Sequence, residues 1–145
     1  MDSVLSAIKT EWQASVTLVA DGDIFITPHL DYIPNGVSLP CIGIKDGAIQ
    51  NVELIGECTE HHGTVLIAAW VPMANDELSI VGSATIAGLI DICEEIESAL
   101  DQNLLNISGL QSLFCESSAP SELIGDERQY LQRKIVTVTY EQEAS

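Results

Sequence analysis

Apolar residues repeat most regularly between Ser83 and Leu104, where they follow the period of an α-helix. The row consists of Ile86, Leu89, Cys93, Ile96, Leu100 and Leu104, at spacings of three and four. At about 100° per residue these positions form one stripe, so the segment is predicted to be a long amphipathic helix. The Ser83 hydroxyl can cap its first turn. We expect this helix to lie across a β-sheet that the rest of the chain supplies.

The opposite side of this predicted helix is purely acidic. Its carboxylates are those of Asp91, Glu94, Glu95, Glu97 and Asp101, with no Lys or Arg among them. Such a strip is either an ordinary solvated surface or a negative surface that keeps polyanions from binding. Metal binding by Glu94 and Glu95 is disfavoured, because adjacent residues on a helix do not converge on one ion.

A shorter helix is predicted at the N-terminus, from Asp2 to about Ser15. Its apolar face contains Leu5, Ile8 and Trp12. The apolar run from Val16 to Ala20 either extends this helix or becomes extended chain, and Ile24 to Thr27 is predicted to be a short strand.

The next segment, from His29 to Pro40, contains two prolines and an Asn35-Gly36 pair, so a loop with a tight turn is expected. Cys41 to Lys45 is predicted to be a strand that Asp46-Gly47 ends. Ala48 to Glu60 and Gly63 to Val71 are then expected to pair as a long hairpin, with His61, His62 and Gly63 in the turn.

The C-terminal third predicts two more strands, Leu110 to Glu116 and Tyr130 to Gln142. Along the second, Val136, Val138 and Tyr140 alternate with Ile135, Thr137 and Thr139. Ser117 to Asp126 is expected to be a loop or hairpin tip, and Glu141 to Ser145 a frayed tail. The whole chain, residues 1–145, therefore predicts one α+β domain, in which one long amphipathic helix and a short N-terminal helix brace a mostly antiparallel sheet.

The charge of the chain is strongly negative. It has 22 acidic residues against 5 basic ones, for a net charge of −17, while 46% of its 145 residues are hydrophobic. This composition predicts a globular protein that does not bind nucleic acid specifically. No run of eighteen apolar residues occurs, which argues against a membrane-spanning helix, and the N-terminus lacks the pattern of a secretory signal.

Few residues carry recognisable chemistry. Cys41, Cys58, Cys93 and Cys115 form no CxxC pair and are expected to be buried free thiols in a reducing compartment.

Two histidine patterns are weak candidates for a metal site or a catalytic site. Cys58 with His61-His62 lacks a second pair of zinc ligands, and a lone His29-x-Asp31 is a weak catalytic signal. Since no phosphate loop, dinucleotide fingerprint or nucleophile elbow occurs, we predict a non-enzymatic protein with no catalytic, cofactor-binding or metal-binding residues.

Three of the five basic residues cluster near the start of the last predicted strand. They are Arg128, Arg133 and Lys134. They form either a salt-bridged sheet edge or a docking patch for an acidic neighbouring subunit, and the pattern alone does not separate the two.

The order of elements resembles that of the tail terminator, or tail completion, proteins of long-tailed bacteriophages. The resemblance rests on the N-terminal MDSVLSAIKTEW, the strand PCIGIKDG, the hairpin ending VLIAAWVP, the long helix and the final YLQRKIVTVTYEQ, and it spans nearly the whole chain. It has no diagnostic motif.

The resemblance implies an α+β structural protein of the virion. Such proteins form a hexameric ring on the finished tail tube, stop its polymerisation and present the surface that joins the head. The implied partners are further copies of the chain, the tail tube protein and head–tail connector proteins, while DNA passes through the ring without specific binding and no membrane is involved. Alternatives are another head–tail connector or a tube subunit and, less favoured, a small hydrolase or metalloprotein.

Overall fold

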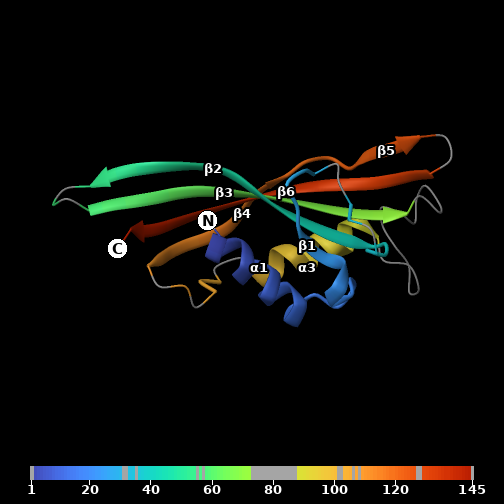
Figure 1. The fold of residues 1–145 in the computed structure, drawn as a ribbon, viewed down its shortest axis with the longest axis horizontal. Helices are drawn as coiled ribbons and strands as arrows, with labels where there is room; N and C mark the ends of the chain where they lie inside the picture. The colour runs from blue at the N-terminus through green and yellow to red at the C-terminus, as the bar shows by residue number, and fades with distance from the viewer. Residues whose placement is uncertain are drawn as a thin grey trace.

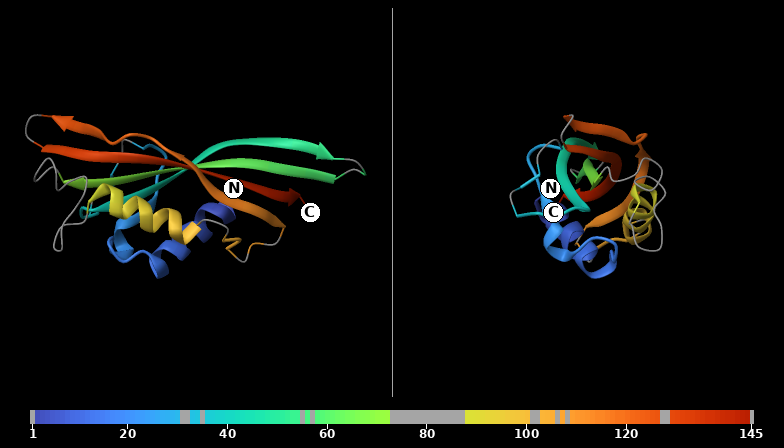
Figure 2. Two further views of the ribbon diagram at one scale, coloured as in Figure 1. Left: turned by 180° about the vertical axis from the view of Figure 1, so that it is seen from behind. Right: turned by 90° about the vertical axis from the view of Figure 1, so that its right-hand side faces the viewer.

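The structure is a twisted six-stranded sheet with two helices packed against one face (Figure 1). The computed structural model describes residues 2–30, 33–34, 36–54, 56, 58–72, 88–100, 103–105, 107, 109–126 and 129–144. The views from behind and from the end show the same arrangement, with α1 (Asp2–Ser15) and α3 (Leu89–Leu100) side by side (Figure 2). The predicted α+β fold is confirmed. Neither α-helix in the described ranges is long and apolar enough to cross a membrane.

The sheet is built around its two longest strands, β3 (Cys58–Pro72) and β6 (Gln129–Ala144). The strand order is β1-β2-β3-β6-β4, with β1 (Ile24–Ile26) parallel to β2 (Cys41–Leu54) and the other neighbours antiparallel. A single 3₁₀ turn, η1 (Asp21–Asp23), leads from α1 into β1.

The far edge of β6 is shared by two strands in succession. β4 (Leu110–Ser118) pairs with the C-terminal half of β6, and β5 (Glu122–Asp126) pairs with its beginning. The prediction that Ser117 to Asp126 is a loop or hairpin tip is therefore wrong for β5, because ladder pairing with β6 holds Glu122–Asp126 extended. The predicted frayed tail is also wrong, since β6 stays paired with β3 as far as Ala144.

The turn of the β2–β3 hairpin lies earlier in the chain than predicted. Leu54 pairs with Cys58, so the turn lies between these residues, and His61 and His62 lie inside β3. Asp46-Gly47 does not end the strand either. A shift of register between Asp46 and Ile49 marks a β-bulge, which accommodates extra residues and lets β2 continue.

The long helix keeps its apolar stripe but is shorter than predicted at its C-terminal end. Its buried residues are Leu89, Ile92, Cys93, Ile96 and Leu100. After Leu100 the chain turns, because Asn103 donates from Nδ2 to the Ala99 carbonyl (3.0 Å) and accepts from the Leu105 amide (2.9 Å). Leu104, predicted to continue the stripe, lies outside the helix and is exposed. The predicted start at Ser83, with Ile86, lies outside the described residues.

Apolar residues are buried on both faces of the sheet. The larger core lies between the helices and the sheet and includes Trp12, Ile96 and Tyr140. A smaller cluster on the other face centres on Phe25 and Trp70, whose rings stack with centroids 5.9 Å apart. Residues from the segment predicted as a loop cover it, namely Leu30, Ile33, Val37 and Leu39. This loop therefore acts as a second, thin layer of the fold.

The alternation predicted for the last strand is confirmed. Val136, Val138 and Tyr140 are buried in the larger core, whereas Ile135 packs against the smaller cluster. Beyond α1 and α3, the β2–β3 hairpin and the end of β6 project past the helical layer (Figure 1). We call this projecting part, residues 49–54, 58–62 and 141–144, the distal sheet.

Gly63 sits where the distal sheet joins the core, and we predict that Gly63→Ala destabilises the protein. A Cβ at this position would overlap the Tyr140 ring, which is itself buried. Overpacking of this kind costs about 1–3 kcal/mol in the free energy of unfolding. Gly22→Ala is the matched control, because nothing lies within 4 Å of its added Cβ, and it should change stability by less than about 0.5 kcal/mol. Urea unfolding of both variants measures this, and equal midpoints would contradict the assigned packing.

Candidate functional site

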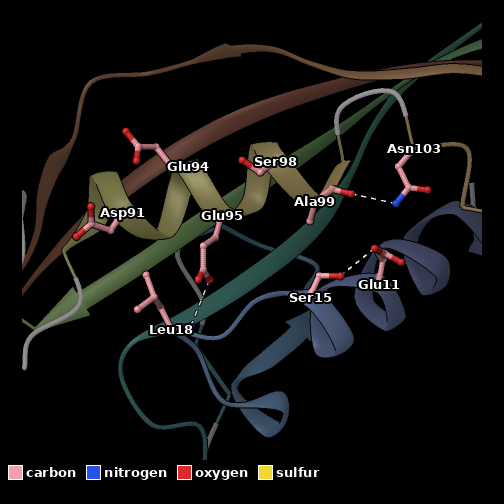
Figure 3. A pocket seen from close by; sticks show the side chains of 9 residues that line it. All are labelled: Glu11, Ser15, Leu18, Asp91, Glu94, Glu95, Ser98, Ala99 and Asn103. Atoms are coloured by element: carbon pink, nitrogen blue, oxygen red, sulfur yellow. Dashed lines mark hydrogen bonds between the residues drawn. The ribbon is translucent and has the colours of Figure 1, made fainter. Parts of the chain in front are cut away.

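An open, acidic groove runs between α1 and α3, with a volume of about 920 Å³ (Figure 3). Its lining residues are Glu11, Ser15, Leu18, Asp91, Glu94, Glu95, Ser98, Ala99 and Asn103. We call it the helix groove. Three members of the predicted acidic strip belong to it, and Glu11 of α1 adds a fourth carboxylate. Glu11 was not among the predicted site residues, although its place beside the buried Trp12 on an amphipathic helix puts it at the margin of the apolar face.

Glu95 differs from the rest of the strip because its carboxylate is held by the chain itself. One oxygen accepts hydrogen bonds from the amides of Thr17 (2.9 Å) and Leu18 (3.3 Å), and the other accepts from the Thr17 hydroxyl (2.6 Å). Figure 3 shows the side chain pointing from α3 toward the segment that follows α1. Glu95 therefore links the segment after α1 to α3. An ordinary solvated carboxylate would make no such contacts.

The other predicted strip residues do not share one direction. Asp91 and Glu94 lie opposite the buried stripe of α3, and Figure 3 shows their side chains pointing in different directions. Glu97 is about 200° around the helix from Glu95, so it lies on the opposite flank. Asp101 lies outside the described residues. The strip is therefore a broad acidic surface, and Asp91, Glu94 and Glu97 are its described carboxylates that make no hydrogen bond in the structure.

The lining of the helix groove contains carboxylates, hydroxyls, an amide and apolar groups, but no Lys or Arg. Clustered carboxylates with nearby low-dielectric walls create a negative potential, which attracts cations and repels polyanions. The groove can exclude nucleic acid from this side of the molecule.

The predicted basic patch does not form one surface in the described residues. Arg133 is buried on the face away from the helices, where it donates to the Leu30 carbonyl (3.0 Å) and pairs with Glu122 of β5 (3.3 Å). Lys134 points to the other face, because neighbouring residues on a strand alternate, and its charge reaches Cys93 of α3. Arg128 lies outside the described residues. Arg133 thus holds the covering loop and β5 together, and a docking role for the patch remains a prediction.

The buried thiols are unsuited to nucleophilic chemistry. Burial raises the pKa of Cys41 to about 12, and the nearby Asp23 adds to the effect. Burial likewise raises the pKa of Cys93 to about 12, against a smaller opposing effect of Lys134. Both are free and buried, as predicted, and both are therefore protonated at neutral pH. Cys115 is only half-buried, and the side chain of Cys58 is not among those that the structure describes.

The histidine patterns are separated by the fold. His61 and His62 are consecutive in β3, so their side chains lie on opposite faces of the sheet. His61 contacts Asn51 through Nδ1, whereas His62 contacts Glu60. His29 is exposed, and Asp31 lies outside the described residues. No shared site forms from these residues in the described ranges.

Comparisons with known proteins identify the fold rather than a family. No protein family and no curated protein matches the sequence. Among solved structures, 27 chains match. One of them comes from the virion of a native gene transfer agent particle and has a TM-score of 0.62. The match covers 97% of this chain and 95% of that chain, at 13% sequence identity. The two chains share their fold from end to end.

The contacts of Glu95 predict that Glu95→Ala destabilises the protein by about 1–3 kcal/mol. The substitution leaves two backbone amides and a hydroxyl without their acceptor at the junction of the helices. Glu94→Ala is the matched control, one residue away and exposed, and is expected to change stability by less than about 0.5 kcal/mol. Chemical unfolding followed by tryptophan fluorescence measures both. Equal losses in the two variants would mean that Glu95 is only part of a solvated surface.

Proposed function

We propose that this protein is a structural component of a phage-like virion, and that it forms a ring which terminates the tail tube and supplies the head-joining surface. The observation that carries the proposal is the end-to-end likeness in fold to a chain of a gene transfer agent virion. The order of elements, which resembles that of tail terminators, supports the same assignment. In this proposal the protein acts by assembly and has no catalytic role.

The two edges of the sheet support assembly into a ring. Closed rings use heterologous contacts, in which one surface of each subunit meets a different surface of the next. Each edge carries exposed apolar side chains at positions where, within the described residues, the strand pairs on one side only. They are Ile26 and Ile49 on β1 and β2, and Phe114 and Leu123 on β4 and β5. Two different edges of this kind can join head to tail, with six copies as the expected number.

The negative charge suits a ring through which DNA passes. A net charge of −17 opposes binding of a polyanion, and Asp91 and Glu94 concentrate part of it on the outer side of α3, with Glu97 on its flank. In the ring these carboxylates face either the lumen or the outer surface. The tail tube protein and the head–tail connector proteins are the proposed partners, and the virion tail is the proposed location.

Particles that lack this protein are predicted to contain tails of uncontrolled length and heads without attached tails. Loss of a terminator leaves the growing tube end open to further subunits. Electron microscopy of particles made with and without the gene measures tail length, and complementation with the intact chain is the control. Tails of normal length would contradict the terminator role. A copy number far above that of one ring, measured in purified virions, would favour a tube subunit instead.

The edge contacts predict that Phe114→Glu with Leu123→Glu prevents ring formation without unfolding the subunit. Both side chains are about half exposed, at 45% and 51%, so each charge stays solvated in the monomer but would be buried at the junction. Mass photometry should give a ring for the unchanged chain and monomers for the variant.

Ile90→Glu on α3 is the matched control for this experiment. Its side chain is 40% exposed and lies on α3 rather than on an edge strand. It is expected to leave the ring intact. Rings that survive the edge variant, with circular dichroism unchanged, would show that the subunits meet elsewhere.

A further inference from the structure

Three potential metal ligands converge on the distal sheet, far from the helix groove. They are Glu60 and His62 of β3 and Glu141 of β6, and their ligand atoms all lie within 4.8 Å of one another. The His62 Nε2 atom is 2.9 Å from a Glu60 carboxylate oxygen. The cluster lies on the face of the sheet opposite to the helices, because its residues alternate with those that face the larger core.

Strand register brings the three side chains together. His62 and Glu141 are direct partners in the antiparallel β3–β6 ladder. Glu60 is two residues before His62, so it points to the same face. The ligands of a tetrahedral zinc ion lie roughly 3.3 Å apart, given Zn–N and Zn–O bonds of about 2.0–2.1 Å. The three groups need only small side-chain movements to reach that spacing, because the ladder already fixes their backbones.

The charge around the cluster favours a cation. Glu143 pairs with Glu60 across the ladder and adds a third carboxylate to the same face. On the other side of β3, the partners of Glu60 and His62 are Val52 and Gln50, which carry no charge. The ion pair between His62 and Glu60 can compensate one carboxylate at most, and two remain close by.

We propose that Glu60, His62 and Glu141 bind a divalent transition-metal ion of the Zn²⁺ type, with water completing its coordination. Imidazole nitrogen with carboxylate oxygen is a donor set that zinc accepts, whereas calcium and magnesium prefer oxygen alone. His62 binds through Nε2, which then carries no proton, and the proton resides on Nδ1. The ion ties β3 to β6 in the distal sheet, beyond α1 and α3. This site does not depend on the proposed role in the tail.

The test is zinc titration of the full-length chain, followed by ¹H–¹⁵N NMR of its three imidazole rings. His62 resonances are expected to shift and saturate on addition of ZnCl₂, while those of His29 and His61 stay in place. Zinc is also expected to raise the thermal unfolding midpoint, because it binds only the folded ladder. His62→Ala should abolish both effects. His61→Ala, on the opposite face, is the matched control and should retain them.

Two conservative variants make the result independent of any folding defect in His62→Ala. Glu60→Gln and Glu141→Gln preserve shape and are expected to weaken zinc binding by about tenfold or more. Glu53→Gln, exposed in the distal sheet on the other face, should bind zinc as the unchanged chain does. The proposal is overturned if zinc does not shift His62, or if the rise in midpoint persists in His62→Ala, which would leave only an ion pair at this position.

Discussion

The antiparallel pairing of β3 with β6 is the interaction on which the rest of the structure depends. Every residue of β3 from Thr59 to Pro72 has a partner in β6, between Leu131 and Ala144. The two strands lie far apart in the sequence, and this ladder spans more of the chain than any other strand pair of the described sheet. β2 pairs with the free edge of β3, and β4 and β5 pair with the free edge of β6. Both apolar clusters and the helical layer then take their positions from the two faces of this ladder.

The ladder also explains why the two ends of the sheet differ. Over the helices, β3 is apolar on both faces, with Ile67 in the larger core and Trp70 in the smaller cluster. Such strands must be covered on both sides, and α3 and the loop that carries Leu30 provide the cover. In the distal sheet the same strands carry Asn51, His61 and Glu60, which tolerate water. The distal sheet can therefore extend past the helices without exposing a core.

The helical stripe and the last strand could be predicted from sequence because each has a clear period. Ile96 and Leu100 follow the helical spacing, and Val136 and Val138 alternate as in a half-buried strand. The end of the long helix could not be placed, because the apolar spacing continues to Leu104 while the Asn103 side chain bonds the backbone in competition with it. Local hydrogen bonding of this kind leaves no periodic signal.

The hairpin register was misplaced for a related reason. Gly47 and the polar His61-His62 pair look like turns, but a bulge accommodates the first and the paired neighbours of β3 hold the second in a strand. Register depends on partners far away in the sequence, so a single sequence constrains it weakly wherever both faces are polar.

For the candidate site, the sequence predicted which residues are acidic but not what each carboxylate does. Glu94 and Glu95 are equivalent in the sequence pattern, yet only Glu95 meets the Thr17 amide, because α1 happens to end beside it. In the same way, Arg133 and Lys134 are neighbours in the chain, but their side chains lie on opposite faces of the sheet. Contacts between distant parts of the chain thus give some charged residues of a run a structural role and leave others exposed to solvent. The carboxylates left free on the surface are consequently fewer and more localised than the run of acidic residues in the sequence suggests.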